Sequence, residues 1–200
     1  MILDKEIYVI DDFIDVKYQE DIKNILMGDY QYEGKDFPWY YTSDVTIAGE
    51  PESQNRPALF HSYVEHTDGE LVGKKITVFH HLFLDMLKKV CKDMNIKNIN
   101  VLQGRSFLQF PLNLKDKIAD TPHTDMDKEH LVVLYYVCDS DGDTLIFNQR
   151  EQSEDGFTIY TIKKRVTPKQ GRIVLFDGSL YHTAEQPLNN HRCIVNYNLG

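Results

Sequence analysis

Two residues with metal-binding side chains, His123 and Asp125, stand two positions apart in the sequence. On an extended backbone the side chains alternate between two faces, so residues i and i+2 point the same way and can bind one ion. A third ligand must then come from another part of the chain. His182 is the candidate, because residues 176–182 have the pattern of a strand, a tight turn and a second strand.

Two neutral imidazoles and one carboxylate form the ligand set that non-haem iron(II) oxygenases place on one face of an octahedral ion. Three adjacent coordination positions then stay open, two for a chelating 2-oxo acid and one for dioxygen. The far carboxylate of such an acid needs a positively charged partner. Arg192, ten residues after His182, suits this role because a guanidinium is always charged and binds a carboxylate through two hydrogen bonds.

Two other functional classes use some of the same features. A zinc hydrolase could hold its ion with two His and one Asp and activate a water molecule, but it would not need Arg192. A non-catalytic jelly-roll binding module would need no metal, and then His123 and Asp125 would simply hydrogen-bond each other. The combination of His123, Asp125, His182 and Arg192 favours the oxygenase.

The pattern resembles that of the 2-oxoglutarate/Fe(II)-dependent dioxygenase superfamily: H-x-D, a long gap, a second His and then a basic residue. The prolyl 4-hydroxylase-like branch is the most similar, because residues 134–137 (Leu-Tyr-Tyr-Val) and 141–147 (Asp-Gly-Asp-Thr-Leu-Ile-Phe) resemble its I-Y-Y-L and G-G-x-L-x-I-F strands. The resemblance covers residues 100–199. It departs at Phe110, where that branch often has Tyr, and at Asn198, near where it often has Trp.

The resemblance implies an enzyme that hydroxylates an unactivated carbon while 2-oxoglutarate is converted to succinate. Its cofactors would be Fe(II), 2-oxoglutarate and dioxygen, with ascorbate as a reductant. His123, Asp125 and His182 would be the catalytic metal ligands, and Arg192 and Tyr136 would hold the cosubstrate. The substrate would be a prolyl residue of a peptide or protein, with a small metabolite or a nucleobase as the alternative.

Alternation along the last predicted strand extends the set of candidate residues. If Arg192 faces inward, so do the even-numbered residues up to Asn198, while the odd-numbered ones face the bracing helices. Asn196 could then order the cosubstrate or a water near the iron, or it could only bond to neighbouring backbone. Tyr136 is either a cosubstrate contact or an ordinary core residue with a capped hydroxyl group.

The order of the predicted elements indicates the fold. Apolar residues recur at helical spacing over 16–27 and 75–94. From residue 98 the chain changes to short strands separated by turns, which predicts a mainly β protein with flanking helices (α+β) and a double-stranded β-helix, or jelly-roll, core. We expect one domain over 1–200, in which 1–97 is a helical and irregular support and 98–200 carries the metal site. The predicted strands are 7–10, 99–111, 131–138, 144–148, 156–162, 172–176, 181–185 and 193–199.

Two irregular segments are candidates for substrate recognition. Residues 29–58 contain aromatic residues from Tyr30 to Tyr41, which either pack on the outer face of the sheet or form a wall of the substrate cleft. Residues 112–122 precede the first metal ligand and form either a lid or a simple connection. The sequence leaves both choices open.

Composition excludes some partners and indicates a compartment. A formal charge of −9 and a pI near 5.3 argue against general binding to nucleic acid or to anionic membranes, since such binding depends on Lys and Arg. Three widely spaced cysteines without a C-x-x-C pair fit buried thiols in a reducing environment. Residues 1–13 lack the basic and then apolar pattern of a secretory signal, and no apolar run is long enough to cross a bilayer. We therefore expect a cytoplasmic protein with a peptide, protein or small-molecule substrate.

Overall fold

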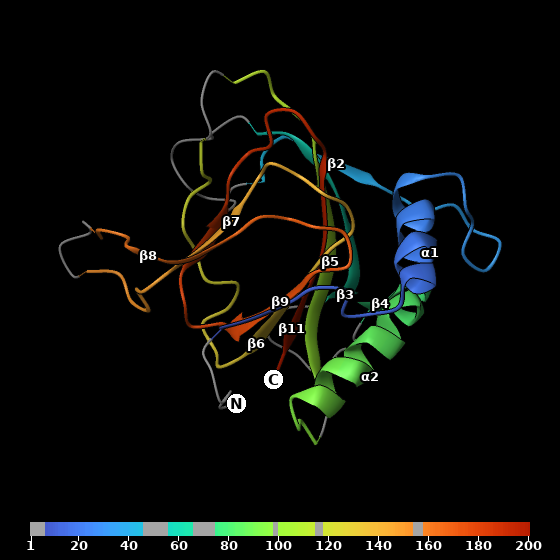
Figure 1. Ribbon diagram of the computed structural model, residues 1–200, viewed down its shortest axis with the longest axis horizontal. Coiled ribbons are helices and arrows are strands. Elements are labelled where there is room, and N and C mark those ends of the chain that lie inside the picture. The colour runs from blue at the N-terminus through green and yellow to red at the C-terminus, as the bar shows by residue number, and fades with distance from the viewer. Residues whose placement is uncertain (1–6, 46–55, 66–74, 98–99, 115–117, 154–157) are drawn as a thin grey trace.

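The computed structural model describes residues 7–45, 56–65, 75–97, 100–114, 118–153 and 158–200, and these form two antiparallel sheets and two α-helices. The helices cover one face of the larger sheet, and the smaller sheet lies on its other side (Figure 1). The predicted class, mainly β with flanking helices, is confirmed. Among the described residues no helix is long and apolar enough to cross a membrane.

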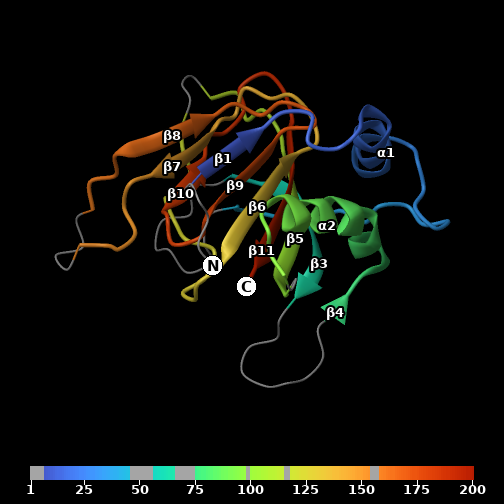
Figure 2. The same ribbon diagram turned by 60° about the horizontal axis from the view of Figure 1, so that its bottom comes forward.

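The larger sheet has eight strands and includes segments from both halves of the chain. β4 pairs with β3 at the side of the sheet, and the other strands follow one another from β1 to β2. The order from β1 to β3 can be followed in Figure 2. In that spatial order they are β1 (Ile7–Ile10), β9 (Ile173–Asp177), β6 (Leu131–Tyr136), β11 (Arg192–Leu199), β5 (Val101–Gln109), β3 (Ala58–Glu65) and β2 (Tyr40–Thr42), with β4 (Lys75–Ile76) beside β3. The smaller sheet contains β10 (His182–Ala184), β7 (Thr144–Phe147) and β8 (Ile162–Val166).

The first helix, α1 (Val16–Met27), agrees with its prediction. The Asp15 side chain accepts a hydrogen bond of 3.0 Å from the Tyr18 backbone N–H, which satisfies one of the donors that a helix start leaves open. Gly28 follows the last turn. The buried residues of α1, Gln19, Ile22, Ile25 and Leu26, share the face that packs on the sheet.

The second predicted helix, 75–94, is only partly correct. Residues Lys75–Ile76 form β4, Val78–Phe83 form a 3-10 helix, and α2 covers Leu84–Asp93. His80 in the 3-10 segment is buried, and its Nδ1 lies 3.0 Å from the hydroxyl group of Tyr197 on β11. This contact joins residues far apart in the sequence, so local periodicity does not encode it.

Two apolar cores lie on the two faces of β11. The odd-numbered residues 193–199 belong to the core between the large sheet and the helices, whereas Ile194 belongs to the core between the two sheets. The predicted alternation of this strand is therefore confirmed. All three cysteines are buried and unpaired.

The strand predictions were otherwise close, with two exceptions. The predicted strand 156–162 is wrong where the structure describes it, because 158–161 are not in a strand and β8 begins at Ile162. Ile159 and Ile162 gave an apolar signal there, but both are exposed. The sequence also missed β2 and β3, and β3 pairs with both β2 and β5. The domain limits and the division at residue 97 remain predictions, although the described residues up to 97 contribute four strands as well as the helices.

Candidate metal centre

The two histidines of the predicted site are brought together by backbone hydrogen bonds. The His123 N–H donates to the His182 carbonyl over 3.0 Å, and the His182 N–H donates to the His123 carbonyl over 2.9 Å. Their ring centroids are 4.8 Å apart. An antiparallel pair of this kind places both side chains on the same side, so the 122–124 segment acts as a short partner for β10.

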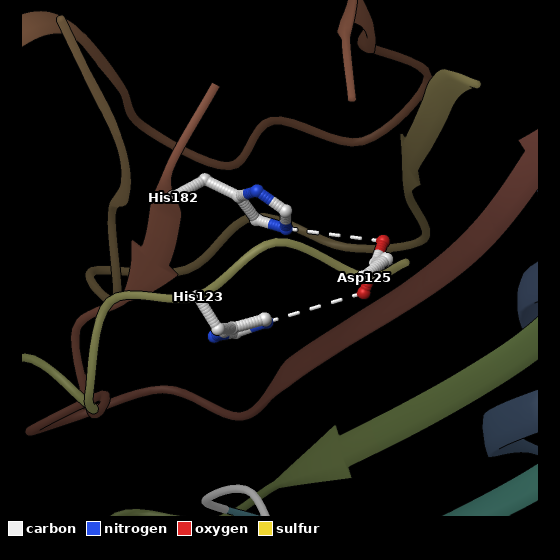
Figure 3. A group of neighbouring side chains, drawn as sticks. All are labelled: His123, Asp125 and His182. Carbon is white, nitrogen blue, oxygen red and sulfur yellow. Dashed lines mark ion pairs between the residues drawn. The ribbon is translucent and has the colours of Figure 1, made fainter. Parts of the chain in front are cut away.

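Asp125 faces both imidazoles (Figure 3). Its Oδ1 lies 4.0 Å from His123 Nε2 and its Oδ2 lies 3.8 Å from His182 Nε2. The possible ligand atoms of the three residues all lie within 4.8 Å of one another. Such atoms bind divalent metals at about 2.0–2.2 Å, so an ion fits between them after small side-chain movements.

Backbone carbonyls fix the orientation of both rings. His123 Nδ1 lies 3.0 Å from the Thr121 carbonyl, and His182 Nδ1 lies 3.1 Å from the Leu180 carbonyl. A carbonyl only accepts, so each Nδ1 carries the hydrogen and each Nε2 keeps its lone pair for a metal. Burial lowers the pKa of His182 to about 4, which keeps this imidazole neutral at neutral pH.

Two side chains hold the carboxylate of Asp125 in place. Arg105 Nη2 on β5 donates to Oδ1 over 2.8 Å, and Asn196 Nδ2 on β11 donates to Oδ2 over 3.0 Å. Burial alone would raise the pKa of Asp125, but the Arg105 guanidinium and the two histidines outweigh it and hold this pKa far below its usual range. Asp125 is thus a buried anion between donors. The sequence predicted Asn196 near the metal, but it missed Arg105.

Arg192 lies at the other end of the same cavity, with its side chain buried. Its guanidinium has three neutral acceptors: Nε donates to the Gly142 carbonyl over 3.0 Å, Nη1 to Gln109 Oε1 over 2.9 Å, and Nη2 to Thr144 Oγ1 over 2.9 Å. Among the described residues no carboxylate forms an ion pair with it. A buried cation without an anion is costly, so this geometry suits an anionic ligand.

Tyr136 lies one hydrogen bond behind this end of the cavity. Its hydroxyl group donates to Thr144 Oγ1 over 2.7 Å, and its ring is fully buried in the core between the sheets. Burial raises its pKa to about 12. Thr144 therefore accepts from both Tyr136 and Arg192, and its own O–H is left to donate to another group. Thr144 and Gln109 line the cavity, while Tyr136 does not.

The cavity between the sheets has a volume of about 710 Å³. Both irregular segments contribute to its wall, through Thr42, Asp44 and Val45 and through Asp120 and Thr121. Residues 46–55 and 115–117 of these segments lie outside the described part. Phe37 and Trp39 pack on the outer core, as one of the two predicted alternatives had it, and Tyr40 and Tyr41 are exposed.

A buried ion pair anchors the chain just before the first metal ligand. Arg56 Nη1 contacts Asp120 Oδ1, and both side chains are less than a tenth exposed. Gln186 Nε2 also donates to Asp120 Oδ1, over 3.3 Å. The Asp120 carbonyl accepts a hydrogen bond of 2.7 Å from the hydroxyl group of Thr183. This network was not predicted, because nothing near Arg56 or Asp120 in the sequence indicates the other.

Comparison with solved structures identifies the fold, although no protein-family model and no curated protein sequence matches the chain. An oxidoreductase of the 2OG-Fe(II) oxygenase family from Burkholderia pseudomallei superposes with a TM-score of 0.68, at 10% identity over 98% of this chain and 85% of that one. This chain has the fold of the 2-oxoglutarate/Fe(II) oxygenases. The predicted jelly roll and the predicted structural resemblance are confirmed.

Other structures with this fold carry different names. A prolyl hydroxylase from Trichoplax adhaerens, in complex with a hypoxia inducible factor peptide fragment, has a TM-score of 0.58 at 13% identity, covering 98% of this chain and 84% of that one. The non-heme alpha ketoglutarate dependent carbocyclase SnoK from nogalamycin biosynthesis has a TM-score of 0.62 at 10% identity, covering 98% and 80%. The fold is therefore shared by a prolyl hydroxylase solved with a peptide fragment and by a carbocyclase.

Proposed function

We propose that the protein is an Fe(II)- and 2-oxoglutarate-dependent oxygenase that hydroxylates an unactivated carbon. One observation carries the proposal: the His123, Asp125 and His182 group lines the same cavity as Arg192, which is buried and has no anionic partner in the described part of the chain. A metal site alone would fit several functions. A metal site that shares a cavity with an unpaired buried guanidinium fits a metal chelator with a distant carboxylate.

The chain supplies the metal-binding part of this site through side chains that are already oriented. His123 Nε2, His182 Nε2 and one Asp125 oxygen would hold the iron, because the Nδ1 hydrogen bonds already orient both rings. When bound, iron with 2-oxoglutarate supplies the oxidising power that activates dioxygen for attack on a C–H bond. The apolar residues of the cavity wall, such as Ile194 and Leu134, limit the access of water to the site.

The chain supplies the part that would bind 2-oxoglutarate through Arg192 and its neighbours. The hydrogen bonds to Gly142, Gln109 and Thr144 fix the guanidinium in one orientation before any ligand arrives. Its remaining N–H groups and the Thr144 O–H can donate to the distant carboxylate of 2-oxoglutarate. Tyr136 supports this arrangement through its hydrogen bond to Thr144.

The substrate class is the finer part of the proposal. A prolyl residue of a peptide is supported by the fold shared with prolyl hydroxylases and by exposed Tyr40 and Tyr41 on β2, whose next residue, Thr42, lines the cavity. Flat exposed rings suit an extended proline-rich segment. A small molecule is supported by the polar residues that line the cavity beside the metal ligands, among them Arg105 and Asn196.

Metal content after anaerobic purification and 2-oxoglutarate-dependent release of succinate test the proposal together. We expect one iron per chain and succinate release in the wild-type protein. Both should be lost in His123→Ala, Asp125→Ala and His182→Ala, since each change leaves the ion two protein ligands. Lys164→Ala, on the exposed edge strand β8, is the matched control and should behave like the wild type. A zinc hydrolase would instead contain zinc and release no succinate. A binding module would contain no metal and release no succinate.

A further inference from the structure

The inward-facing residues of β5 line the cavity at successive positions along the strand. Gln109, Phe107, Arg105 and Gln103 alternate along the strand, and all four line the cavity. Gln109 is paired in register with Arg192, at the proposed cosubstrate end. Arg105 lies four residues further, about 13 Å along the strand at roughly 3.3 Å per residue, beside Asp125. Gln103 lines the cavity beyond the metal ligands.

Arg105 has few partners for a side chain in a cavity. Of its five N–H groups, one donates to Asp125 Oδ1, and its Cζ lies 5.5 Å from the centroid of the Phe107 ring. Its Nε is buried without a hydrogen-bond partner among the described residues. Arg192, in contrast, has an acceptor for each of its three nitrogens. Arg105 therefore has donor capacity that the described part of the chain does not satisfy.

A second unsatisfied atom lies at the same level. Asn196 is paired in register with Arg105, is only 8% exposed, and lines the cavity. Its Nδ2 donates to Asp125, but its Oδ1 is buried with no partner among the described residues. Unsatisfied buried polar atoms are rare in native proteins and each calls for an explanation. An unpaired donor and an unpaired acceptor beside one cavity are explained by a polar ligand that binds both.

Charge indicates which kind of ligand this is. Asp125 is the only anion that pairs with Arg105 in the described part of the chain. A divalent ion bound at Asp125 would compete for the same carboxylate charge and leave the guanidinium only partly neutralised. A guanidinium in that position binds a carboxylate ligand more strongly than it binds a neutral ligand.

We propose that Arg105 binds a free carboxylate of the substrate, and that the substrate is therefore a small carboxylic acid rather than an internal residue of a peptide. The inference rests on the proposed function and names the substrate class of that site. An internal prolyl residue has its carboxyl group in an amide bond, so it cannot supply this charge. The cavity, at about 710 Å³, is of the size that holds small ligands. Glu65 lines the same cavity, which suits a carboxylic acid that also carries an amino group, such as a free amino acid.

Binding to the Zn(II)-substituted protein, with 2-oxoglutarate present at saturation, tests this inference without turnover. The probes are the free α-amino acids and short-chain monocarboxylic acids, each paired with its primary amide as a matched uncharged control. We expect one or more acids to shift the Nε–H resonance of Arg105 in nitrogen-15 NMR spectra. These acids should bind about tenfold to a hundredfold more tightly than their amides, as expected for a hydrogen bond to a charged group.

Variants of Arg105 distinguish substrate binding from support of Asp125. Arg105→Gln should abolish the preference for acid over amide, and Arg105→Lys, which keeps the charge, should retain part of it. Because Arg105 also holds Asp125, each variant is compared at full Zn(II) occupancy by the ratio of its dissociation constants for acid and amide, which loss of support for Asp125 alone would not change. Arg172→Gln is the matched control, since Arg172 pairs with Asp11 and does not line the cavity.

Two results would overturn the inference. One is that no acid in the panel binds more tightly than its amide. The other is that Arg105→Gln weakens metal binding but keeps the preference for the acid, which would make Arg105 only a positioning residue for Asp125. Failure of the proposed function would be distinguishable, because the wild-type protein would then bind no 2-oxoglutarate and release no succinate.

Discussion

Replacement of Arg192 by Gln should weaken the binding of 2-oxoglutarate strongly. The change removes the positive charge but keeps a polar side chain in the buried position. In the wild-type protein the guanidinium is held by Gly142, Gln109 and Thr144, and none of these carries a charge that could replace it. A carboxylate entering this end of the cavity would therefore lose the cationic partner that Arg192 offers.

The magnitude follows from the burial of the group. Loss of one partner from a buried, hydrogen-bonded charge pair costs about 2–5 kcal/mol, and each 1.4 kcal/mol is about tenfold in affinity. We expect the dissociation constant of 2-oxoglutarate to rise about 30-fold to a few thousandfold. Thr144→Val keeps the guanidinium charge but removes the O–H that can donate to the carboxylate, a hydrogen bond to a charged group worth about 1.5–3 kcal/mol. It should therefore raise the constant about tenfold to a hundredfold.

Isothermal titration calorimetry of the Zn(II)-substituted proteins with 2-oxoglutarate measures both effects. The Zn(II) content of each variant serves as a control, since Arg192 does not contact the metal ligands in the described structure. A dissociation constant for Arg192→Gln within about twofold of the wild type would refute the assignment of Arg192 as the cosubstrate clamp. A larger effect of Thr144→Val than of Arg192→Gln would move the clamp away from the guanidinium.

Two further predictions concern stability. Arg56→Met leaves Asp120 as a buried and unpaired anion, so the free energy of unfolding in urea should fall by about 3–5 kcal/mol; a loss below about 1 kcal/mol would show that the pair is not structurally important. Burial lowers the pKa of His182 from its ordinary value of 6.5 to about 4, so the unfolded metal-free protein binds the proton first as the pH falls. The stability from neutral His182 is thus fully present above pH 6.5 and is lost as the pH falls toward 4. His182→Gln should flatten the pH dependence in that window, and an unchanged slope would contradict the low pKa.

The three candidate metal ligands could be selected from the sequence by residue type and spacing, and the structure brings them together. His123 and Asp125 stand two residues apart, although Asp125 lies in a bend and not in a strand. The alternation of β11 correctly placed Arg192, Asn196 and Ile194 on the inner face. A repeat of this kind survives in any extended strand. The two-residue pattern can therefore be recognised without knowing which strand is the neighbour.

The partners of these residues could not be predicted in the same way. The contact between Arg105 and Asp125, 20 residues apart, depends on the register of β5 and on the path of the loop before β6. Gln109 is a similar case. Phe110, where the related branch often has Tyr, packs against the outer core and His191, whereas its neighbour Gln109 accepts a hydrogen bond from Arg192.

The remaining differences arise from tertiary contacts that override local pattern. Apolar spacing over 75–94 predicted one helix, but the first part follows the pairing of β4 with β3 and the contact of His80 with Tyr197. The strand β3 was missed although it is flanked by β5 and β2. Its sequence follows a polar segment and contains His61 and Ser62 among apolar residues, so its signal was weak.

Anaerobic addition of Fe(II) and then 2-oxoglutarate tests the central claim most directly. Chelation of iron by the 2-oxo acid at a His123, Asp125 and His182 site should produce a charge-transfer absorption band in the visible spectrum. We predict this band in the wild-type protein at one iron and one 2-oxoglutarate per chain, and its absence in Asp125→Ala. A wild-type protein that binds both components without the band, or an Asp125→Ala protein that shows the band unchanged, would contradict the account.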